Sequence, residues 1–437
     1  MKKFTALLTA AALLLTAGCS NGASSQSESA SSQTSADSTA QQTESAPSQT
    51  SADSAPEQSE TPPAESAPDY SKLTEEEIYD LMVERSLITT GDMTRMANTL
   101  KRAQNGENLT VAYIGGSITE GYNAGTDDNF AKIATEWLDE QFPEAEISAV
   151  NAGISGTPSV LGNVRLERDV LAYDPDIVFV EFAVNDGTEQ VYKDSYESMV
   201  RTLLTQDKEI AVVLLFTVIK SGHTCQPHMS QIGELYGLPM ISLPNALGVE
   251  LEEGRMTWED YSMDESHPNA FGHTMIRDFI AHYYEQVIPV IDENVGEVPE
   301  QLPEPIFSDR WQNTHYLDSE KLTPDEAVNF TEFKTHDRFQ HGWTYKGEEG
   351  GSFKFKITCD SLALVFKANN SSIFADAQVY VDGELTHTVH SNMSDGWNNP
   401  VTEYIIDEKE CAEHEVEIRI EGGKKQVFFI LAFGYSE

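Results

Sequence analysis

The chain has 437 residues, and its 72 acidic side chains outnumber the 28 basic ones, which gives a formal net charge of −44. Only seven of the acidic residues lie within residues 20–68, so the rest of the chain is itself strongly acidic. This charge argues against nucleic acid, anionic lipid surfaces and polyanionic substrates as partners, and it favours a neutral or cationic substrate. The length exceeds that of one ordinary domain and predicts two folded units.

The first 19 residues have the charge, the apolar run and the small-residue ending of a secretory signal peptide. Cys19 follows these small residues as in the lipobox of bacterial lipoproteins, although Thr16 stands where leucine is usual. We expect residues 1–19 to be a lipoprotein signal peptide with Cys19 lipidated, and the protein to be extracytoplasmic at a bacterial cell surface. The alternative is an ordinary secreted protein in which Cys19 is incidental. Because no other run reaches the roughly 18 apolar residues of a spanning helix, we expect membrane contact only through the anchor.

Residues 20–68 consist almost entirely of Ser, Thr, Ala, Gln, Pro and Glu, and they repeat the sequence SQTSADS at 32–38 and 48–54. Such a segment cannot bury a core, so we expect a disordered linker. Fully extended, this linker would reach on the order of 150 Å from an anchor.

Residues 72–105 are predicted to be helical, with Ser71 or Thr74 as the cap. Further along, short apolar runs alternate with amphipathic stretches, and a last helix is expected over 269–287. The apolar runs cover residues 110–114, 147–150, 177–182, 210–216 and 238–243. Apolar strands that alternate with helices indicate a parallel sheet covered on both faces. We therefore predict a three-layer α/β/α domain over residues 70–290.

Residues 291–306 are acidic and rich in proline, which indicates a linker between domains. Beyond them the apolar residues alternate with period two, as in strands that are buried on one face. The predicted strands cover residues 352–358, 362–368, 377–389, 402–407, 414–420 and 427–435. Asp382-Gly383 indicates a hairpin turn within the third of these runs. We predict an all-β domain over residues 307–437, a sandwich that resembles a jelly roll.

Ser117 lies in GGSITEG (115–121), a glycine-flanked turn directly after a predicted strand. A serine hydroxyl becomes a good nucleophile only when a base takes its proton and a third group orients that base. Asp264 and His267 stand three residues apart in DESHP, where Asp264 could accept from one imidazole nitrogen while the other nitrogen faces Ser117. Taken alone, such a serine is more often a helix cap, and an isolated DxxH is more often part of a polar surface.

Acyl transfer also needs donors that stabilise the oxyanion. Gly156 in NAGISG (151–156) would let the backbone present its N–H to a substrate, and Asn185 in FAVND (182–186) would present a side-chain amide. Each alone is more commonly a turn glycine or a cap at the end of a strand. All of these residues follow predicted strands of one parallel sheet, whose carboxyl ends form the usual working edge.

The four blocks together resemble the SGNH (GDSL-like) hydrolase superfamily, which is named for a Ser, a Gly, an Asn and a His, with an Asp three residues before the His. The resemblance covers about residues 107–290. Gly116 departs from the family, since its namesake motif has Asp there, and Ile118 replaces Leu. The family implies the α/β/α fold and a serine esterase that needs no metal or organic cofactor.

The resemblance also implies a role for each residue. Ser117 would attack the ester carbonyl, with His267 as general base and then acid. Asp264 would orient His267. The backbone N–H groups of Ser117 and Gly156, together with the Asn185 amide, would hold the oxyanion.

Several other polar residues are less specific. His223 and Gln226 lie in the loop after the fourth predicted strand and could line a substrate pocket, although solvated loop residues are the commoner case. Cys225, Cys359 and Cys411 match no zinc-binding spacing. Cys359 and Cys411 could pair across a sandwich or remain as two thiols in a core.

The superfamily includes lipases, thioesterases, arylesterases and carbohydrate acetylesterases, so its fold does not select the ester. Export on a linker, the acidity, and a β domain that resembles the jelly-roll partners of bacterial polysaccharide deacetylases favour carbohydrate. Trp343, Trp397 and Trp311 are candidates to stack on sugar rings, although core packing is the usual fate of tryptophan. We expect an esterase that removes O-acetyl groups from a polysaccharide or oligosaccharide.

Two alternatives stay open. One is a lipid or other acyl-ester hydrolase of the same superfamily, and the other is a glycan-binding lipoprotein with an inactive hydrolase core. The intact set of five expected residues argues against the second. The β domain could bind sugar, shape the active site or only brace the hydrolase domain.

Overall fold

The computed structural model describes residues 69–124, 128–334 and 338–437, and these belong to one compact unit, Pro68–Glu437. The predicted signal peptide, the lipidation at Cys19 and the linker over 20–68 lie outside the described residues. Within the described ranges, no helix has the length and apolar character needed to cross a membrane.

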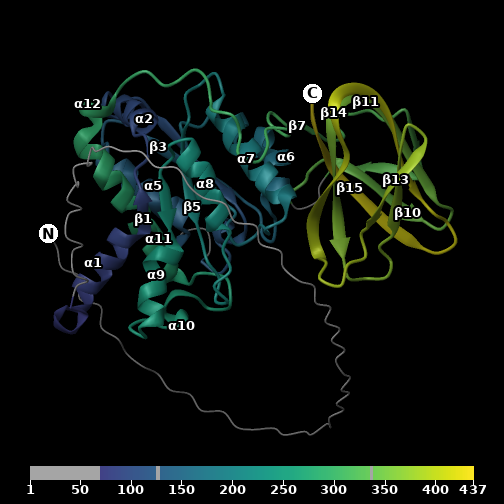
Figure 1. The fold of residues 1–437 in the computed structure, drawn as a ribbon. Coiled ribbons are helices and arrows are strands. Elements are labelled where there is room, and N and C mark those ends of the chain that lie inside the picture. The colour runs from purple at the N-terminus through teal and green to yellow at the C-terminus, as the bar shows by residue number, and fades with distance from the viewer. Residues whose placement is uncertain (1–68, 125–127, 335–337) are drawn as a thin grey trace, which may run out of the picture. The chain divides into compact units, whose positions relative to one another are not determined.

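The first domain is built on a six-stranded sheet with the strand order β1-β6-β5-β4-β2-β3 (Figure 1). The strands are β1 (Leu87–Thr89), β2 (Leu109–Gly115), β3 (Ile147–Gly153), β4 (Ile177–Glu181), β5 (Ala211–Phe216) and β6 (Met240–Ser242). Strands β2 to β6 pair in parallel, as predicted. Strand β1 is antiparallel to β6 and was not predicted.

Strand β1 interrupts the segment 72–105 that the sequence predicted as helical. The segment forms α1 (Glu75–Ser86) and α2 (Thr94–Gln104), with the strand between them. Thr74 caps α1 in a capping box with Glu77, one of the two caps expected. The helical prediction was wrong over 87–89 because the β-branched residues there favour a strand and find a partner in β6.

Helices cover both faces of this sheet (Figure 1). They are α3 (Ser117–Glu120), α5 (Phe130–Gln141), α6 (Ser159–Asp169), α7 (Gln190–Leu204), α8 (Gln226–Leu235), α9 (Leu243–Glu252), α10 (Trp258–Tyr261) and α11 (Ala270–Val287). Successive residues of β2 point to opposite faces. Tyr113 packs in one core cluster with Phe130 of α5, and Ile114 packs in the other with Leu203 of α7. Both faces are therefore buried, which explains the continuous apolar runs and confirms the three-layer prediction.

The carboxyl ends of three neighbouring strands lie side by side. Gly115 at the end of β2 is in register with Gly153 of β3 on one side and with Glu181 of β4 on the other. The three segments that leave these residues carry Ser117, Gly156 and Asn185 respectively. The sheet thus brings three motifs that are far apart in the sequence to one edge.

The second domain is an all-antiparallel β sheet in which seven strands follow the order β13-β12-β14-β11-β15-β10-β9, while β7 pairs with β15 and β8 with β11. The strands are β7 (His315–Leu317), β8 (Glu326–Val328), β9 (Phe330–Phe333), β10 (Gly342–Gly347), β11 (Gly351–Asn369), β12 (Asp376–Val381), β13 (Glu384–His390), β14 (Trp397–Ile420) and β15 (Gln426–Ser436). Asp382 and Gly383 both have positive φ, 52° and 82°, as the predicted hairpin turn requires.

Four predicted strands of this domain are parts of two longer ones. Strand β11 joins the runs 352–358 and 362–368, and β14 joins 402–407 and 414–420. The pairing of β11 with β14 shifts register between Cys359 and Ser361, so the polar residues there form an irregularity within a strand instead of a turn.

The segment between the domains is held by the first domain. Ile291–Asn294 form a short helix, α12, at the start of the predicted linker. Further on, the buried carboxylate of Glu197 in α7 accepts hydrogen bonds from the backbone N–H groups of Ile306, Phe307 and Ser308 at 2.9, 2.6 and 3.0 Å. The chain therefore enters the β domain along α7.

Candidate functional site

Ser117, His267 and Asp264 form one hydrogen-bonded chain. His267 Nε2 lies 2.9 Å from Ser117 Oγ, and His267 Nδ1 lies 2.8 Å from Asp264 Oδ2. Ser117 begins α3 directly after β2, and the other two residues lie in the loop between α10 and α11. Because the Asp264 carboxylate accepts only, Nδ1 carries the proton in this arrangement and Nε2 is left to accept one from Ser117.

The loop itself fixes the Asp264 carboxylate. Asp264 Oδ1 accepts hydrogen bonds from the backbone N–H groups of Ser266 at 2.8 Å and His267 at 2.7 Å. Partial burial works to raise the pKa of Asp264, but the hydrogen bonds from the His267 ring and from these N–H groups outweigh it and lower the pKa to about 2. The carboxylate therefore stays ionised and holds the imidazole in one tautomer and orientation.

The two candidate oxyanion groups lie in the segments that follow β3 and β4. Gly156 has φ +67°, a conformation that favours glycine. Asn185 follows β4, and its amide packs directly against Gly116: a Cβ built on Gly116 would lie 2.1 Å from Asn185 Oδ1. This contact gives a physical reason for glycine at the position where the namesake motif has Asp, since a side chain there would displace Asn185.

Two exposed aromatic rings each contact one residue of the candidate site. Trp397 at the start of β14 is 55% exposed, and a Cβ on Gly156 would lie 2.6 Å from its Cζ2 atom. Tyr122 is 51% exposed, and its ring centroid lies 4.4 Å from that of His267. Trp397 was among the residues predicted from the sequence, whereas Tyr122 was not. The sequence signal for Tyr122 is its place just after Gly121, the left-handed residue that ends the turn carrying Ser117.

The other two tryptophan candidates do not reach a substrate. Trp343 is 1% exposed and packs edge to face on Phe353 in the core of the β domain, so its expected role in substrate binding is wrong. Trp311 is also buried, and its ring stacks on Tyr404 at a centroid distance of 3.8 Å. Both rings stabilise packing instead of offering a face to solvent.

The lower-ranked loop residues bond away from the triad. His223 Nε2 lies 3.1 Å from the backbone oxygen of Asp186. The Gln226 side chain accepts from Ser242 Oγ at 2.7 Å and donates to Asn245 Oδ1 at 3.3 Å. These contacts tie α8 to its neighbours and give no specific support to a role in substrate binding.

Cys225, Cys359 and Cys411 are free cysteines. Cys359 is buried and Cys411 is exposed, so the two neither pair nor form two core thiols.

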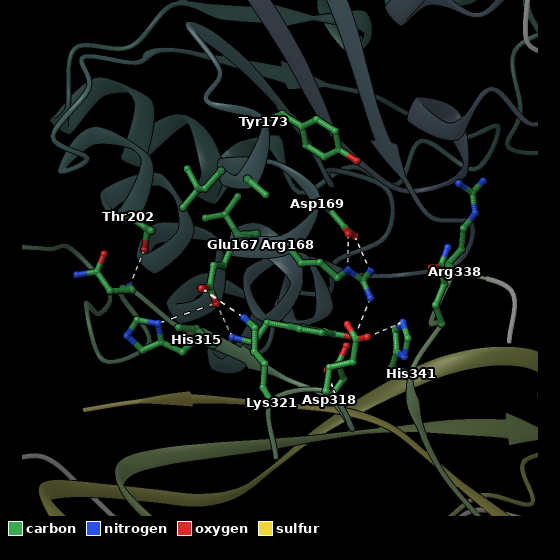
Figure 2. A pocket seen from close by; sticks show the side chains of 18 of the residues that line it. Glu167, Arg168, Asp169, Tyr173, Thr202, His315, Asp318, Lys321, Arg338 and His341 are labelled. Atoms are coloured by element: carbon green, nitrogen blue, oxygen red, sulfur yellow. Dashed lines mark hydrogen bonds and ion pairs between the residues drawn. The ribbon is translucent and has the colours of Figure 1, made fainter. Parts of the chain in front are cut away.

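A separate cavity of about 870 Å³ lies beside α6 and is lined by both domains (Figure 2). Four of its charged residues form two ion pairs: Arg168 with Asp169 at 2.5 Å and Lys321 with Glu167 at 3.6 Å. Ser117, Asp264 and His267 are not among its lining residues.

Residues 113–275, which include all five motif residues, match the model of the GDSL-like lipase/acylhydrolase family. The chain thus carries a GDSL-like hydrolase domain, as the motifs indicated.

Among known proteins, an acetylxylan esterase of Geobacillus stearothermophilus is 27% identical over 206 residues, which cover 39% of this chain and 91% of that protein. The whole described architecture is similar to a two-domain esterase (CEX) active on acetylated mannans, solved alone and co-crystallised with mannopentaose. Each is 26% identical in sequence to this chain, and each match covers 81% of this chain. The structure solved alone is matched over 99% of its length with a TM-score of 0.74, and the mannopentaose structure over 98% with a TM-score of 0.73. The chain is a carboxylic ester hydrolase with an additional β-sheet domain.

Proposed function

We propose that the protein is a serine esterase that removes O-acetyl groups from a polysaccharide or oligosaccharide. The observation that carries this proposal is the hydrogen-bonded chain Asp264–His267–Ser117, with one exposed aromatic ring beside His267 and another against Gly156. The relatives that act on acetylated xylan and acetylated mannan support the choice of substrate class.

In the proposed reaction, Ser117 Oγ attacks the acetyl carbon while His267 Nε2, 2.9 Å away, accepts its proton. The sugar oxygen leaves with that proton and an acetyl-serine remains. A water molecule then repeats the sequence, giving its proton to His267 and releasing acetate. No other co-reactant is required, and the atoms balance with water as the second substrate.

The oxyanion would be held by the N–H groups of Ser117 and Gly156 and by the Asn185 amide. Asn185 supports this role because its amide lies against the nucleophile turn. One such donor is worth about 3 kcal/mol of transition-state stabilisation.

The aromatic rings support a carbohydrate leaving group. Two planar, exposed rings in contact with residues of the site offer apolar area to the faces of pyranose rings. Trp397 lies against the backbone of Gly156, and Tyr122 lies beside His267, so both rings are placed to contact the sugar that carries the acetyl ester and then leaves.

Acyl selectivity and acetate release test the proposal together. We expect the protein to release acetate from acetylated mannan or xylan, and to hydrolyse the C2 member of a 4-nitrophenyl ester series faster than members of C8 and longer. A preference for long acyl chains, with no acetate released from any acetylated glycan in a panel, would instead support the lipid or acyl-ester hydrolase.

The location is a further part of this proposal. The signal-peptide pattern before Cys19 supports a lipid anchor at the outer face of a bacterial membrane, with substrate reached over the linker. Replacing Cys19 by serine should release the protein from the membrane fraction, and unchanged membrane association would contradict the anchor.

A further inference from the structure

Glu181 is a buried acid that contacts the turn carrying Ser117. It takes no part in the proton transfers proposed above. It is the last residue of β4 and is only 1% exposed. Its Oε2 accepts a hydrogen bond from Thr119 Oγ1 at 2.8 Å, and its Oε1 accepts one from Thr217 Oγ1 at 2.6 Å.

One of the two hydroxyl donors, Thr119, belongs to the turn that presents Ser117 and follows that residue by two positions. On the other side of Ser117, Gly115 at the end of β2 is in register with Glu181 at the end of β4. The turn is thereby tied to Glu181 by a side-chain hydrogen bond after Ser117 and by strand pairing before it.

The fit around the carboxylate is tight. A Cβ on Gly115 would lie 2.7 Å from Glu181 Oε2 and 2.2 Å from Thr119 Oγ1. Glu181 therefore reaches the turn only because β2 ends in glycine. Burial raises the pKa of Glu181 to about 7, so an ionised carboxyl at this position lowers the free energy of unfolding.

We infer that Glu181 is a positioning residue that holds the Gly116–Thr119 turn, so that Ser117 Oγ stays in reach of His267 Nε2. This inference rests on the proposed role of Ser117 as nucleophile. Without Glu181 the turn loses its acceptor, and a displacement of about 1 Å at a reacting atom costs about a hundredfold in rate.

Thr119 and Thr217 offer a matched pair for the test. Both are fully buried, and both donate a hydroxyl to the same carboxylate, but Thr119 lies in the nucleophile turn and Thr217 follows β5. Thr119→Val and Thr217→Val each remove one hydrogen bond with little change of volume. A merely structural role predicts similar effects on activity from the two changes, whereas a positioning role predicts a larger effect from Thr119→Val.

The experiment measures kcat and KM for 4-nitrophenyl acetate, the rate at which a fluorophosphonate probe labels Ser117, and the free energy of unfolding. We expect Glu181→Leu to lower kcat and the labelling rate about a hundredfold with KM within threefold of the parent. Glu181→Gln keeps an acceptor oxygen, so its kcat and labelling rate should be at least about tenfold higher than those of Glu181→Leu. Thr119→Val should lower kcat about tenfold, and Thr217→Val less than threefold.

Three results would overturn the inference: a folded Glu181→Leu protein with the parent's kcat and labelling rate, a Glu181→Gln protein that loses as much activity as Glu181→Leu, or equal losses from the two threonine changes. If Glu181→Leu does not fold, the two threonine variants still decide. Failure of the proposed function would give a different result: the Ser117→Ala protein would keep full activity. That result does not depend on how the Glu181 variants behave.

Discussion

The indole of Trp397 lies against the backbone of Gly156, so close that a Cβ at residue 156 would come within 2.6 Å of the ring. The tryptophan belongs to the β domain, and the glycine belongs to the loop that follows β3 of the hydrolase domain. Arg338 of the β domain adds a second contact, an ion pair with Glu120 in the turn that carries Ser117. Glu120 in turn accepts the N–H of Ser155 at 2.9 Å. The β domain thus contacts the segment expected to hold the oxyanion.

Gly156→Ala should lower kcat for 4-nitrophenyl acetate at least tenfold, because the new methyl group meets Trp397 and φ is +67°. The double variant Gly156→Ala/Trp397→Ala removes the collision and should recover part of the loss, while the backbone strain remains. Steady-state kinetics of the two variants would check this. Equal activity in the single and double variants would show that the indole does not constrain the loop.

Trp397→Ala alone should weaken the binding of large substrates and leave small ones almost unaffected. Loss of one exposed ring that stacks on sugar should raise KM for acetylated mannan about three- to tenfold, with the kinetics for 4-nitrophenyl acetate changed less than twofold. Tyr173→Ala is a suitable control, since Tyr173 is equally exposed but lines the separate cavity. A loss confined to the small ester would contradict a role in glycan binding.

Gly116→Ala tests the placement of the Asn185 amide. The added Cβ would lie 2.1 Å from Asn185 Oδ1, so the amide must move, and kcat should fall about a hundredfold, as for Asn185→Ala. Gly248 in α9 has open space around it, so Gly248→Ala should leave kcat unchanged and stabilise the fold by up to about 1 kcal/mol. Parent activity in Gly116→Ala would argue against Asn185 as an oxyanion donor.

Stability should fall as the pH rises from about 6.5 to 8. Burial raises the pKa of Asp186 to about 8 and that of Glu181 to about 7, so the folded protein keeps protons that the unfolded chain has released. Their stabilising effect is present at low pH and is lost as the pH rises through these values. His228 and His273, whose pKa burial lowers to about 4, act in the opposite sense, but their effect is complete near pH 6.5.

The expected loss of unfolding free energy is on the order of 2 kcal/mol, measured by chemical denaturation at several pH values. Asp186→Asn removes one titrating group and should flatten the dependence. An unchanged slope in that variant would show that Asp186 does not titrate in this range.

The sequence predicted the sheet and the meeting of the motif residues because both follow from short-range patterns. Apolar runs of strand length identify parallel strands, and the carboxyl ends of such strands meet at one edge, so Ser117 and Asn185 could be placed together. The three-residue spacing of Asp264 and His267 lies within one loop, where the sequence alone defines the neighbours.

The missed features depend on contacts between distant segments. Trp397 meets Gly156, and Tyr122 meets His267, only after the chain has folded, and no local pattern encodes either pair. The error at Trp343 was avoidable, since Trp343 and Tyr345 follow the period-two alternation of a strand and both point into the core.

Acetate release by the Ser117→Ala protein tests the central claim most directly. With acetylated mannan or xylan as substrate, the parent and a control with the exposed Ser221 changed to alanine should release acetate at the same rate. The Ser117→Ala protein should stay folded and release acetate at least about a thousandfold more slowly. Acetate release by folded Ser117→Ala at the parent rate would contradict the assignment of Ser117 as the nucleophile.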